Sequence, residues 1–206
     1  ETLRAWVHKG HGFLGVGEPT AYEKNGRFFQ LADVLGVDKE RGFTLSEDRY
    51  NIEKKAHFIT ADVKGQIDYG EGMKNVYALN GAEVLDITFS DRFKRNVNVG
   101  EVKLVANGYG KGRGVYIAGL PYSSQNARLL QRALFWAAHK EEEMFKAFSS
   151  DPETECSYYP ELGKYAIVNN AGKERTTKFY DMHGSVKTIC LGTHILWLNE
   201  SGRENL

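Results

Sequence analysis

The sequence predicts a partial doubly wound α/β domain with a β-rich insertion over residues 1–150, followed by a small all-β sandwich domain over residues 151–206. The α/β domain is predicted by a strand, turn and amphipathic helix near the amino terminus and by a long amphipathic helix near its end. The β domain is predicted because the residues after Pro152 form short β-type runs without a helical period.

The first strand and helix lie in residues 10–37. The apolar run of residues 13–16 has glycines on both sides and stops before Pro19, as a short buried strand does. From Arg27 onward, apolar residues recur at intervals of three and four, and Gly36 stands where a left-handed helix cap is expected. This segment is therefore predicted to be half of a βαβ unit.

Residues 1–9 place apolar side chains on one helical face, so the chain is predicted to begin inside or just before a helix. In a doubly wound sheet such a helix comes after an earlier strand, and residues 13–16 are the only run that clearly suits a parallel strand. We therefore expect part of the sheet to precede Glu1 in a longer protein.

Further β-type runs are separated by Gly, Asn and Asp. In the insertion they are residues 56–60, 75–79, 83–89, 101–107 and 115–118. In the β domain they are residues 165–168, 176–180, 185–191 and 195–198, with turns at residues 170–172 and 183–184. The spacing of this second set predicts a small antiparallel sandwich.

A long helix is predicted over residues 124–148, because the serine pair at 123–124 offers an N-cap and a broad apolar face comes after it. Leu130, Leu134 and Ala138 step by four along one side of this helix. We expect that side to pack on the sheet that contains the first strand.

Composition excludes several classes of protein. Lys plus Arg and Asp plus Glu both count 27, so no net charge would attract nucleic acid or an anionic membrane. No apolar run approaches the roughly 20 residues of a membrane-spanning helix, and the amino terminus lacks the plan of a signal peptide. We therefore expect a cytoplasmic protein that binds neither nucleic acid nor membranes. Cys156 and Cys190 are too few for a disulfide framework and are expected to be reduced.

Two glycine-rich segments match anion-binding patterns. Residues 10–15 have the dinucleotide-binding spacing G-x-G-x-x-G, but these glycines come after a helical pattern and lead into a strand, which is the reverse of the required order. Residues 108–114 alternate glycine with other residues and include Lys111 and Arg113, so they could form an anion nest. A hairpin is the favoured interpretation, because this segment joins two β-type runs and opens no helix.

Glu18 is a further candidate for contact with a ligand, because it lies at the turn after the first strand. Local amides at the start of a helical turn are its favoured partners. The six histidines show no metal-ligand spacing, so zinc is not expected. Glu18, Lys111 and Arg113 are therefore the candidate ligand contacts, and no catalytic, cofactor-binding or metal-binding residue is assigned.

Three segments resemble a known family. Residues 10–37 (GHGFLGVGEPTAYEKNGRFFQLADVLGV), 102–143 (VKLVANGYGKGRGVYIAGLPYSSQNARLLQRALFWAAHKEEE) and 158–179 (YYPELGKYAIVNNAGKERTTKF) resemble the 1,3-β-galactosyl-N-acetylhexosamine phosphorylases, also called lacto-N-biose or galacto-N-biose phosphorylases. Members of that family begin with a (β/α)8 barrel that houses the chemistry, and this chain resembles only the part of those proteins after the barrel. The resemblance implies a non-catalytic carboxy-terminal part, beginning with a domain like the class I glutamine amidotransferases.

The resemblance also implies the chemistry of the parent enzyme. A carboxylic acid protonates the glycosidic oxygen while inorganic phosphate attacks the anomeric carbon from the opposite face, which releases α-galactose 1-phosphate and an N-acetylhexosamine. The expected partners are inorganic phosphate, a β-galactosyl disaccharide and further copies of the chain in a homo-oligomer. No cofactor is implied. Because the acid and the phosphate site of the family lie in its barrel, no catalytic residue is carried onto this chain.

A free-standing carbohydrate-binding module is an alternative function that remains open, and a glutaminase is a second alternative that the sequence disfavours. A glutaminase would need a Cys at the turn after a strand, but that turn reads GVGE (residues 15–18), and both cysteines lie in the β-rich tail. A free-standing carbohydrate-binding module would use aromatic side chains of the β domain as a stacking platform, although core packing is their favoured role. The aromatic residues in question are Tyr158, Tyr159, Tyr165, Phe179, Tyr180 and Trp197.

Overall fold

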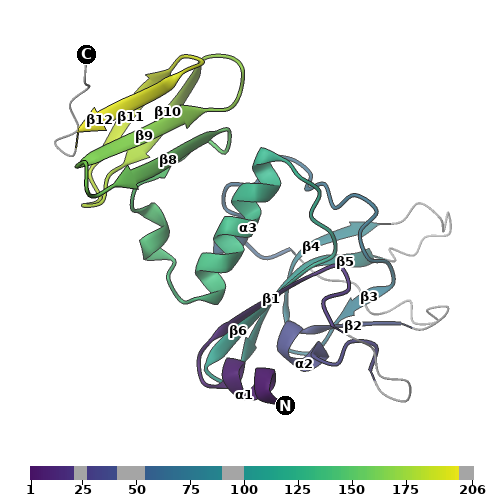
Figure 1. Ribbon diagram of the computed structural model, residues 1–206. Helices are drawn as coiled ribbons and strands as arrows, with labels where there is room; N and C mark the ends of the chain where they lie inside the picture. Colours follow the sequence, from purple (N-terminus) through teal and green to yellow (C-terminus); the bar gives the residue numbers. More distant parts are fainter. Residues whose placement is uncertain (21–26, 41–53, 90–99, 200–206) are drawn as a thin grey trace. The chain divides into compact units, whose positions relative to one another are not determined.

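The computed structural model describes residues 1–20, 27–40, 54–89 and 100–199. The chain divides into two compact units, Glu1–His139 and Lys140–Leu206. Most of its regular structure is β-sheet, and its helices are few (Figure 1). Within the described residues, no helix is long and apolar enough to cross a membrane.

The first unit is built on a four-stranded sheet with the order β1-β6-β5-β4. β1 (Gly12–Val16) runs parallel to β6 (Gly112–Ile117), whereas β5 (Gly100–Tyr109) is antiparallel to both β6 and β4 (Glu83–Phe89). All four strands were predicted within a few residues of their observed bounds. Among the described residues, β1 has β6 as its only strand neighbour, so it forms an edge of the sheet.

β5 and β6 form the hairpin that was predicted for residues 108–114. Gly110 has a φ of +62° in the two-residue turn, a conformation that glycine adopts without strain. Gly114 has a different role, because a Cβ at this position would overlap the carbonyl oxygen of Val34. The glycines of this segment thus serve the turn and the close packing of the chain.

The helix predicted from Arg27 is reduced to one turn, α2 (Ala32–Leu35), which contacts β5 and β6. Its left-handed cap at Gly36 is confirmed, with a φ of +73°. The longer helix does not form because the buried carboxylate of Asp38 accepts the backbone N–H of Phe29 at 3.0 Å. This bond holds the chain before α2 in a non-helical path. The residues after α2 form a short ladder between β2 (Val37–Lys39) and β3 (Val76–Ala78).

Residues 56–60 were predicted to be a strand, which is wrong. They contain the single 3-10 turn η1 (Phe58–Thr60). The imidazole Nδ1 of His57 accepts the backbone N–H of Ile59 at 3.1 Å and thereby caps this turn. Ile59 is fully buried, so the apolar residues of this run do pack inside, but from a turn rather than from a strand.

The amino-terminal helix α1 (Thr2–His8) contacts β6, and the long helix α3 (Ser124–Ala137) contacts β1 and β6. The predicted cap of α3 is confirmed, since the Ser123 hydroxyl accepts the backbone N–H of Asn126 at 3.1 Å. The predicted end near Phe148 is wrong. The chain leaves the helix at Ala137.

The predicted packing face of α3 is also wrong. Leu129, Ala133 and Ala137 are buried, whereas Leu134 is 51% exposed and Ala138 is exposed. Two neighbouring rows of apolar residues on α3 have helical spacing. The row of Leu129, Ala133 and Ala137 faces β1, whereas the predicted row of Leu130, Leu134 and Ala138 does not. A Cβ on Gly12 would overlap the carbonyl of Ala137, so the helix and the strand approach closely where both residues are small.

The second unit contains two three-stranded antiparallel sheets whose core is formed by Tyr165, Ile167, Phe179, Leu191 and Leu198. One sheet consists of β7 (Phe148–Ser149), β10 (Arg175–Tyr180) and β11 (Val186–Leu191). The other consists of β8 (Thr154–Tyr159), β9 (Lys164–Asn169) and β12 (Ile195–Asn199), and the 3-10 turn η2 (Glu142–Phe145) precedes both. The predicted sandwich and its last four strands are confirmed. β7 and β8 were not predicted.

Candidate functional site

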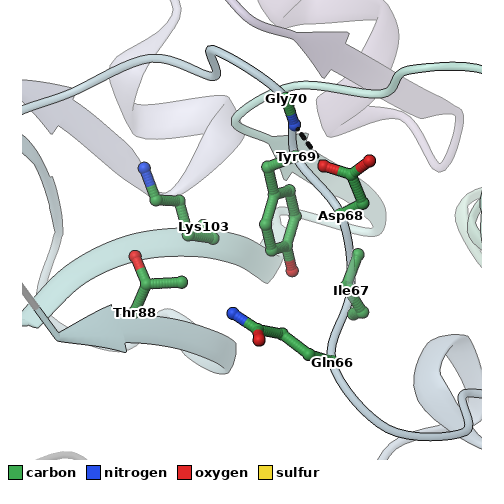
Figure 2. A pocket seen from close by; sticks show the side chains of 7 residues that line it. All are labelled: Gln66, Ile67, Asp68, Tyr69, Gly70, Thr88 and Lys103. Carbon is green, nitrogen blue, oxygen red and sulfur yellow. Dashed lines mark hydrogen bonds between the residues drawn. The ribbon is translucent and has the colours of Figure 1, made fainter.

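A polar cavity lies over the neighbouring strands β4 and β5 of the first unit. It has a volume of about 450 Å³ and is lined by residues 66–70, Thr88 and Lys103. Thr88 and Lys103 project from neighbouring strands on one side, and the extended segment of residues 66–70 forms the other side (Figure 2). A second hollow of about 770 Å³ shares three of these lining residues and continues toward Lys54 and Lys55. Together the two hollows form a groove.

The first turn of α3 fixes the wall that residues 66–70 provide. The buried amide of Asn126 donates to the carbonyl of Asp68 at 2.9 Å, and the amide of Gln125 donates to the carbonyl of Gln66 at 3.3 Å. Within the wall, the Asp68 carboxylate accepts the backbone N–H of Gly70 at 2.8 Å (Figure 2). Hydrogen bonds from α3 therefore hold the start and the middle of this wall in place.

Tyr69 anchors the middle of the wall to the sheet. Its hydroxyl donates to the buried carboxylate of Asp86 at 2.8 Å, and the other oxygen of that carboxylate lies 2.5 Å from the ammonium of Lys54. Burial, with the adjacent negative charge and hydrogen bond of Asp86, raises the pKa of Tyr69. The Tyr69 phenol therefore stays protonated and acts as a structural donor.

Lys103 forms the floor of the cavity, with a side chain that is only 9% exposed. Its ammonium donates to Glu101 Oε2 at 2.8 Å and to the carbonyl of Met73 at 3.3 Å. Thr88 pairs with Glu101 across β4 and β5, and side chains two residues apart on a strand share one face. Thr88, Glu101 and Lys103 therefore share one face of the sheet, and the side chains of Thr88 and Lys103 line the cavity.

Several polar groups at the cavity have no protein partner within the described part of the chain. They are the side-chain amide of Gln66, the hydroxyl of Thr88 and the second carboxylate oxygen of Asp68. An ammonium has three N–H donors, of which Lys103 uses two in the hydrogen bonds above. The cavity thus offers donors and acceptors of several kinds within a small volume.

The ligand contacts suggested by the sequence lie elsewhere. The guanidinium of Arg113 donates to the carbonyl of Trp136 at 2.7 Å and lies 4.7 Å from the centre of that indole ring, which places Arg113 at the end of α3. The side chain of Lys111 is exposed at the hairpin turn, and Glu18 lies at the turn after β1. None of the three lines the cavity, and a role for them in ligand contact stays a prediction.

Sequence reasoning missed the cavity residues. Lys103 carries the clearest signal that could have been used, because a lysine between Val102 and Leu104 in a buried strand needs a polar partner. Gln66 and Thr88 carry no such signal. They meet only because α3 holds the segment of residues 66–70 against β4.

The environment of the cysteines does not suit a glutaminase. Cys156 and Cys190 both lie in the second unit, and burial raises the pKa of the Cys156 thiol to about 12. A nucleophilic cysteine needs a lowered pKa instead. Among the described residues, no group of three His, Cys, Asp or Glu side chains is placed to hold a metal ion.

Comparison with known proteins identifies the family. The family model of the lacto-N-biose phosphorylase central domain matches residues 1–142, and that of the C-terminal domain of the same family matches residues 148–198. This chain belongs to the lacto-N-biose phosphorylase family. The resemblance that the sequence carries is thereby confirmed.

The curated relatives of this chain in the lacto-N-biose phosphorylase family are much longer proteins. A 1,3-β-galactosyl-N-acetylhexosamine phosphorylase of Lachnoclostridium phytofermentans is 47% identical over 196 residues, which are 95% of this chain and 26% of the relative. A 1,3-β-galactosyl-N-acetylhexosamine phosphorylase of Bifidobacterium longum subsp. longum is 43% identical over 86% of this chain and 27% of the relative. The chain therefore spans about a quarter of the length of these relatives.

Among solved structures, the fold of this family member is similar to parts of β-galactosidases. A β-galactosidase of Rahnella sp. R3 superposes on this chain with a TM-score of 0.55 and 18% sequence identity. The superposition covers 96% of this chain and 30% of the β-galactosidase. The GH42 β-galactosidase Gan42B superposes with a TM-score of 0.51 at 17% identity, over 96% and 29%. The mostly β architecture is thus shared with these enzymes. The predicted fold of a class I glutamine amidotransferase is not confirmed.

Proposed function

We propose that this chain is a non-catalytic region of a phosphorylase that reversibly converts a β-galactosyl-N-acetylhexosamine and inorganic phosphate into α-galactose 1-phosphate and free N-acetylhexosamine. One observation carries the proposal. The chain is 47% identical, over 95% of its length, to a relative named for this substrate, yet it spans only 26% of that relative.

The described side chains support a role other than catalysis. An inverting reaction of this kind needs a carboxylic acid beside the leaving oxygen and a cationic site that holds phosphate on the opposite face. In the groove over β4 and β5, each of these two lysines already has a carboxylate partner, Lys103 beside Glu101 and Lys54 beside Asp86. Neither lysine is available as an unpaired cation for phosphate.

An assay with two proteins tests this proposal. The purified 206-residue chain and the full-length polypeptide that contains it are each incubated with lacto-N-biose or galacto-N-biose and inorganic phosphate, and galactose 1-phosphate is measured. We expect product from the full-length protein alone. Product from the chain by itself would contradict its non-catalytic role, and no product from the full-length protein would contradict the parent activity.

A carbohydrate-binding module is the second candidate, and one observation favours it. Tyr159 on β8 and Trp197 on β12 are 44% and 39% exposed, and their ring centres lie 5.8 Å apart. Tyr165 and Phe179 are buried in the sandwich core, so they cannot contribute to a surface platform. Loss of galactoside binding in Trp197→Ala, with an unchanged unfolding transition, would support this second function.

The finer expectations for the parent enzyme belong to the same proposal. We expect it to form a homo-oligomer and to act in the cytoplasm, where a charged sugar phosphate would be retained by the membrane. We also propose that the four-stranded sheet belongs to a doubly wound domain of the amidotransferase kind, because β1 and β6 are parallel and α3 packs on both. Sedimentation analysis of the full-length protein tests the oligomer.

A further inference from the structure

We propose that the cavity between residues 66–70 and strands β4 and β5 binds an uncharged saccharide. This would be a ligand site of the central domain itself. Its volume of about 450 Å³ falls within the range of roughly 300–1,000 Å³ that is usual for small-molecule sites.

The polar groups at the cavity suit a ligand rich in hydroxyls. A sugar hydroxyl both donates and accepts, so it pairs best with a mixture of amide, hydroxyl, carboxylate and ammonium groups. Gln66 offers an amide donor and acceptor, Thr88 offers a hydroxyl, and Asp68 offers a carboxylate oxygen. Lys103 retains one N–H after its two hydrogen bonds.

The balance of charge disfavours an anionic ligand. Lys103 lies 2.8 Å from Glu101, and Lys54 lies 2.5 Å from Asp86. Lys55 is 3.9 Å from Glu83 at the far end of the groove. A phosphate would have to approach these carboxylates and the nearby Asp68, whereas a neutral saccharide can use the same groups as hydrogen-bond partners.

Hydrogen bonds within the protein also hold the wall of the cavity in place. Tyr69 is tied to Asp86, and Asn126 holds the backbone of Asp68, so the wall does not need to be ordered by the ligand. Ile67 and the ring of Tyr69 supply apolar surface between the polar groups (Figure 2). A preformed site of this kind keeps the entropy cost of binding small.

The test is a protein-observed NMR titration of the 206-residue chain with methyl β-galactoside, lacto-N-biose, N-acetylglucosamine, glucose and inorganic phosphate. Only the choice of galactosides as first probes rests on the proposed function. We expect saturable shifts of the amides of residues 66–70, 88 and 103 with at least one sugar, with a dissociation constant of about 1–10 mM. Inorganic phosphate is expected to leave these amides unchanged.

Two variants and a matched control sharpen the experiment. Thr88→Val removes a hydroxyl with little change of shape, and Gln66→Leu removes an amide. Each should weaken binding about 5- to 10-fold, as the loss of one hydrogen bond does. Gln131→Leu makes the same change on the exposed side of α3, outside the cavity lining, and should leave the affinity unchanged. Matching thermal transitions establish that all three variants fold.

The outcomes separate this inference from the proposed function. Binding of glucose but not of galactosides at the cavity would support the saccharide site and count against its link to a galactoside enzyme. No saturable shift with any sugar, shifts confined to Trp197 and Tyr159, or saturable binding of phosphate at residues 66–70 would each overturn the saccharide site. Equal weakening by Gln131→Leu and Gln66→Leu would overturn it as well.

Discussion

The guanidinium Nε of Arg132 lies 2.7 Å from the carboxylate Oδ2 of Asp62, and this ion pair joins the buried side of α3 to the segment that leads into the cavity wall. Arg128, one turn earlier on α3, reaches the same oxygen at 3.2 Å. Burial opposes ionisation of Asp62, but the hydrogen bonds from Arg132 and Arg128 outweigh it and lower the pKa of Asp62.

This cluster makes the free energy of unfolding depend on pH. Because the pKa of Asp62 is lower in the folded than in the unfolded chain, its stabilisation is present above the unfolded value of about 3.9 and is lost as the pH falls through the folded value. Asp62→Asn should lower the free energy of unfolding at pH 7 by about 1.5–3 kcal/mol. Urea titrations at pH 7 and pH 3 measure the difference, which should shrink at the lower pH. A difference that does not depend on pH would contradict the role of the charge.

A second prediction concerns the orientation of α3. Leu129 is 1% exposed, so Leu129→Ala should lower the free energy of unfolding by about 2–5 kcal/mol. The sequence predicts this cost for Leu134→Ala, but Leu134 is 51% exposed, so its truncation should cost about 1 kcal/mol or less. Denaturant titration of both variants, with Glu142→Ala as an exposed control, compares them directly. A larger loss for Leu134→Ala would mean that α3 is rotated.

The hairpin between β5 and β6 offers a pair of glycines that differ only in their surroundings. Gly114→Ala should destabilise the fold by about 1–3 kcal/mol, because the added methyl group overlaps the carbonyl of Val34. Gly108→Ala places a methyl group in open space in the same hairpin, so it should change stability by about 0.5 kcal/mol or less. The thermal unfolding midpoints of the two variants measure this difference in stability. Equal transitions would show that α2 does not pack against β6.

The two cysteines should differ in reactivity. Cys190 is exposed, whereas burial raises the pKa of the Cys156 thiol to about 12. A thiol reagent at pH 8 should therefore modify Cys190 quickly and Cys156 only after unfolding, because the thiolate is the reactive form. Cys190→Ser should abolish the fast phase and leave the slow one. A persistent fast phase in that variant would place Cys156 at the surface.

Limited proteolysis distinguishes two boundaries between the domains. The sequence predicts a boundary near Pro152, whereas the structure divides the chain between His139 and Lys140. The Thr177 hydroxyl accepts the backbone N–H of Asp151 at 3.0 Å, so the segment before Pro152 is hydrogen-bonded to the sandwich. Trypsin should therefore cut early after the exposed Lys140 and leave a stable carboxy-terminal fragment. Early cleavage by a glutamate-specific protease after Glu153 or Glu155 would favour the sequence prediction instead.

The last four strands of the sandwich could be predicted because each combines β-type residues with a turn signal at its ends. Gly172 and Gly184 occupy two such turns, with φ values of +66° and +85°. The phase of α3 could not be predicted in the same way, because Leu129 and Leu130 begin two apolar stripes and the one that is buried has fewer leucines. The close approach of Gly12 to Ala137 selects between them, and that contact joins residues far apart in the chain.

The cavity was beyond sequence reasoning for a related reason. Thr88 and Lys103 share one face of the sheet only because of the register between β4 and β5, which shifts at an irregularity around Asp86. Residues 66–70 reach them through hydrogen bonds to α3. Neither the register nor those long-range bonds leaves a periodic pattern in the sequence.

The position of β1 at the edge of its sheet, among the strands that the structure describes, affects how the chain behaves in solution. An edge strand can present amide and carbonyl groups that template another strand. Leu3 and Trp6 also expose apolar surface on the helix that precedes β1. At high concentration, we therefore expect copies of the chain to associate through this edge. Dilute samples are the condition in which the affinity of a single molecule for sugars can be measured without interference from aggregation.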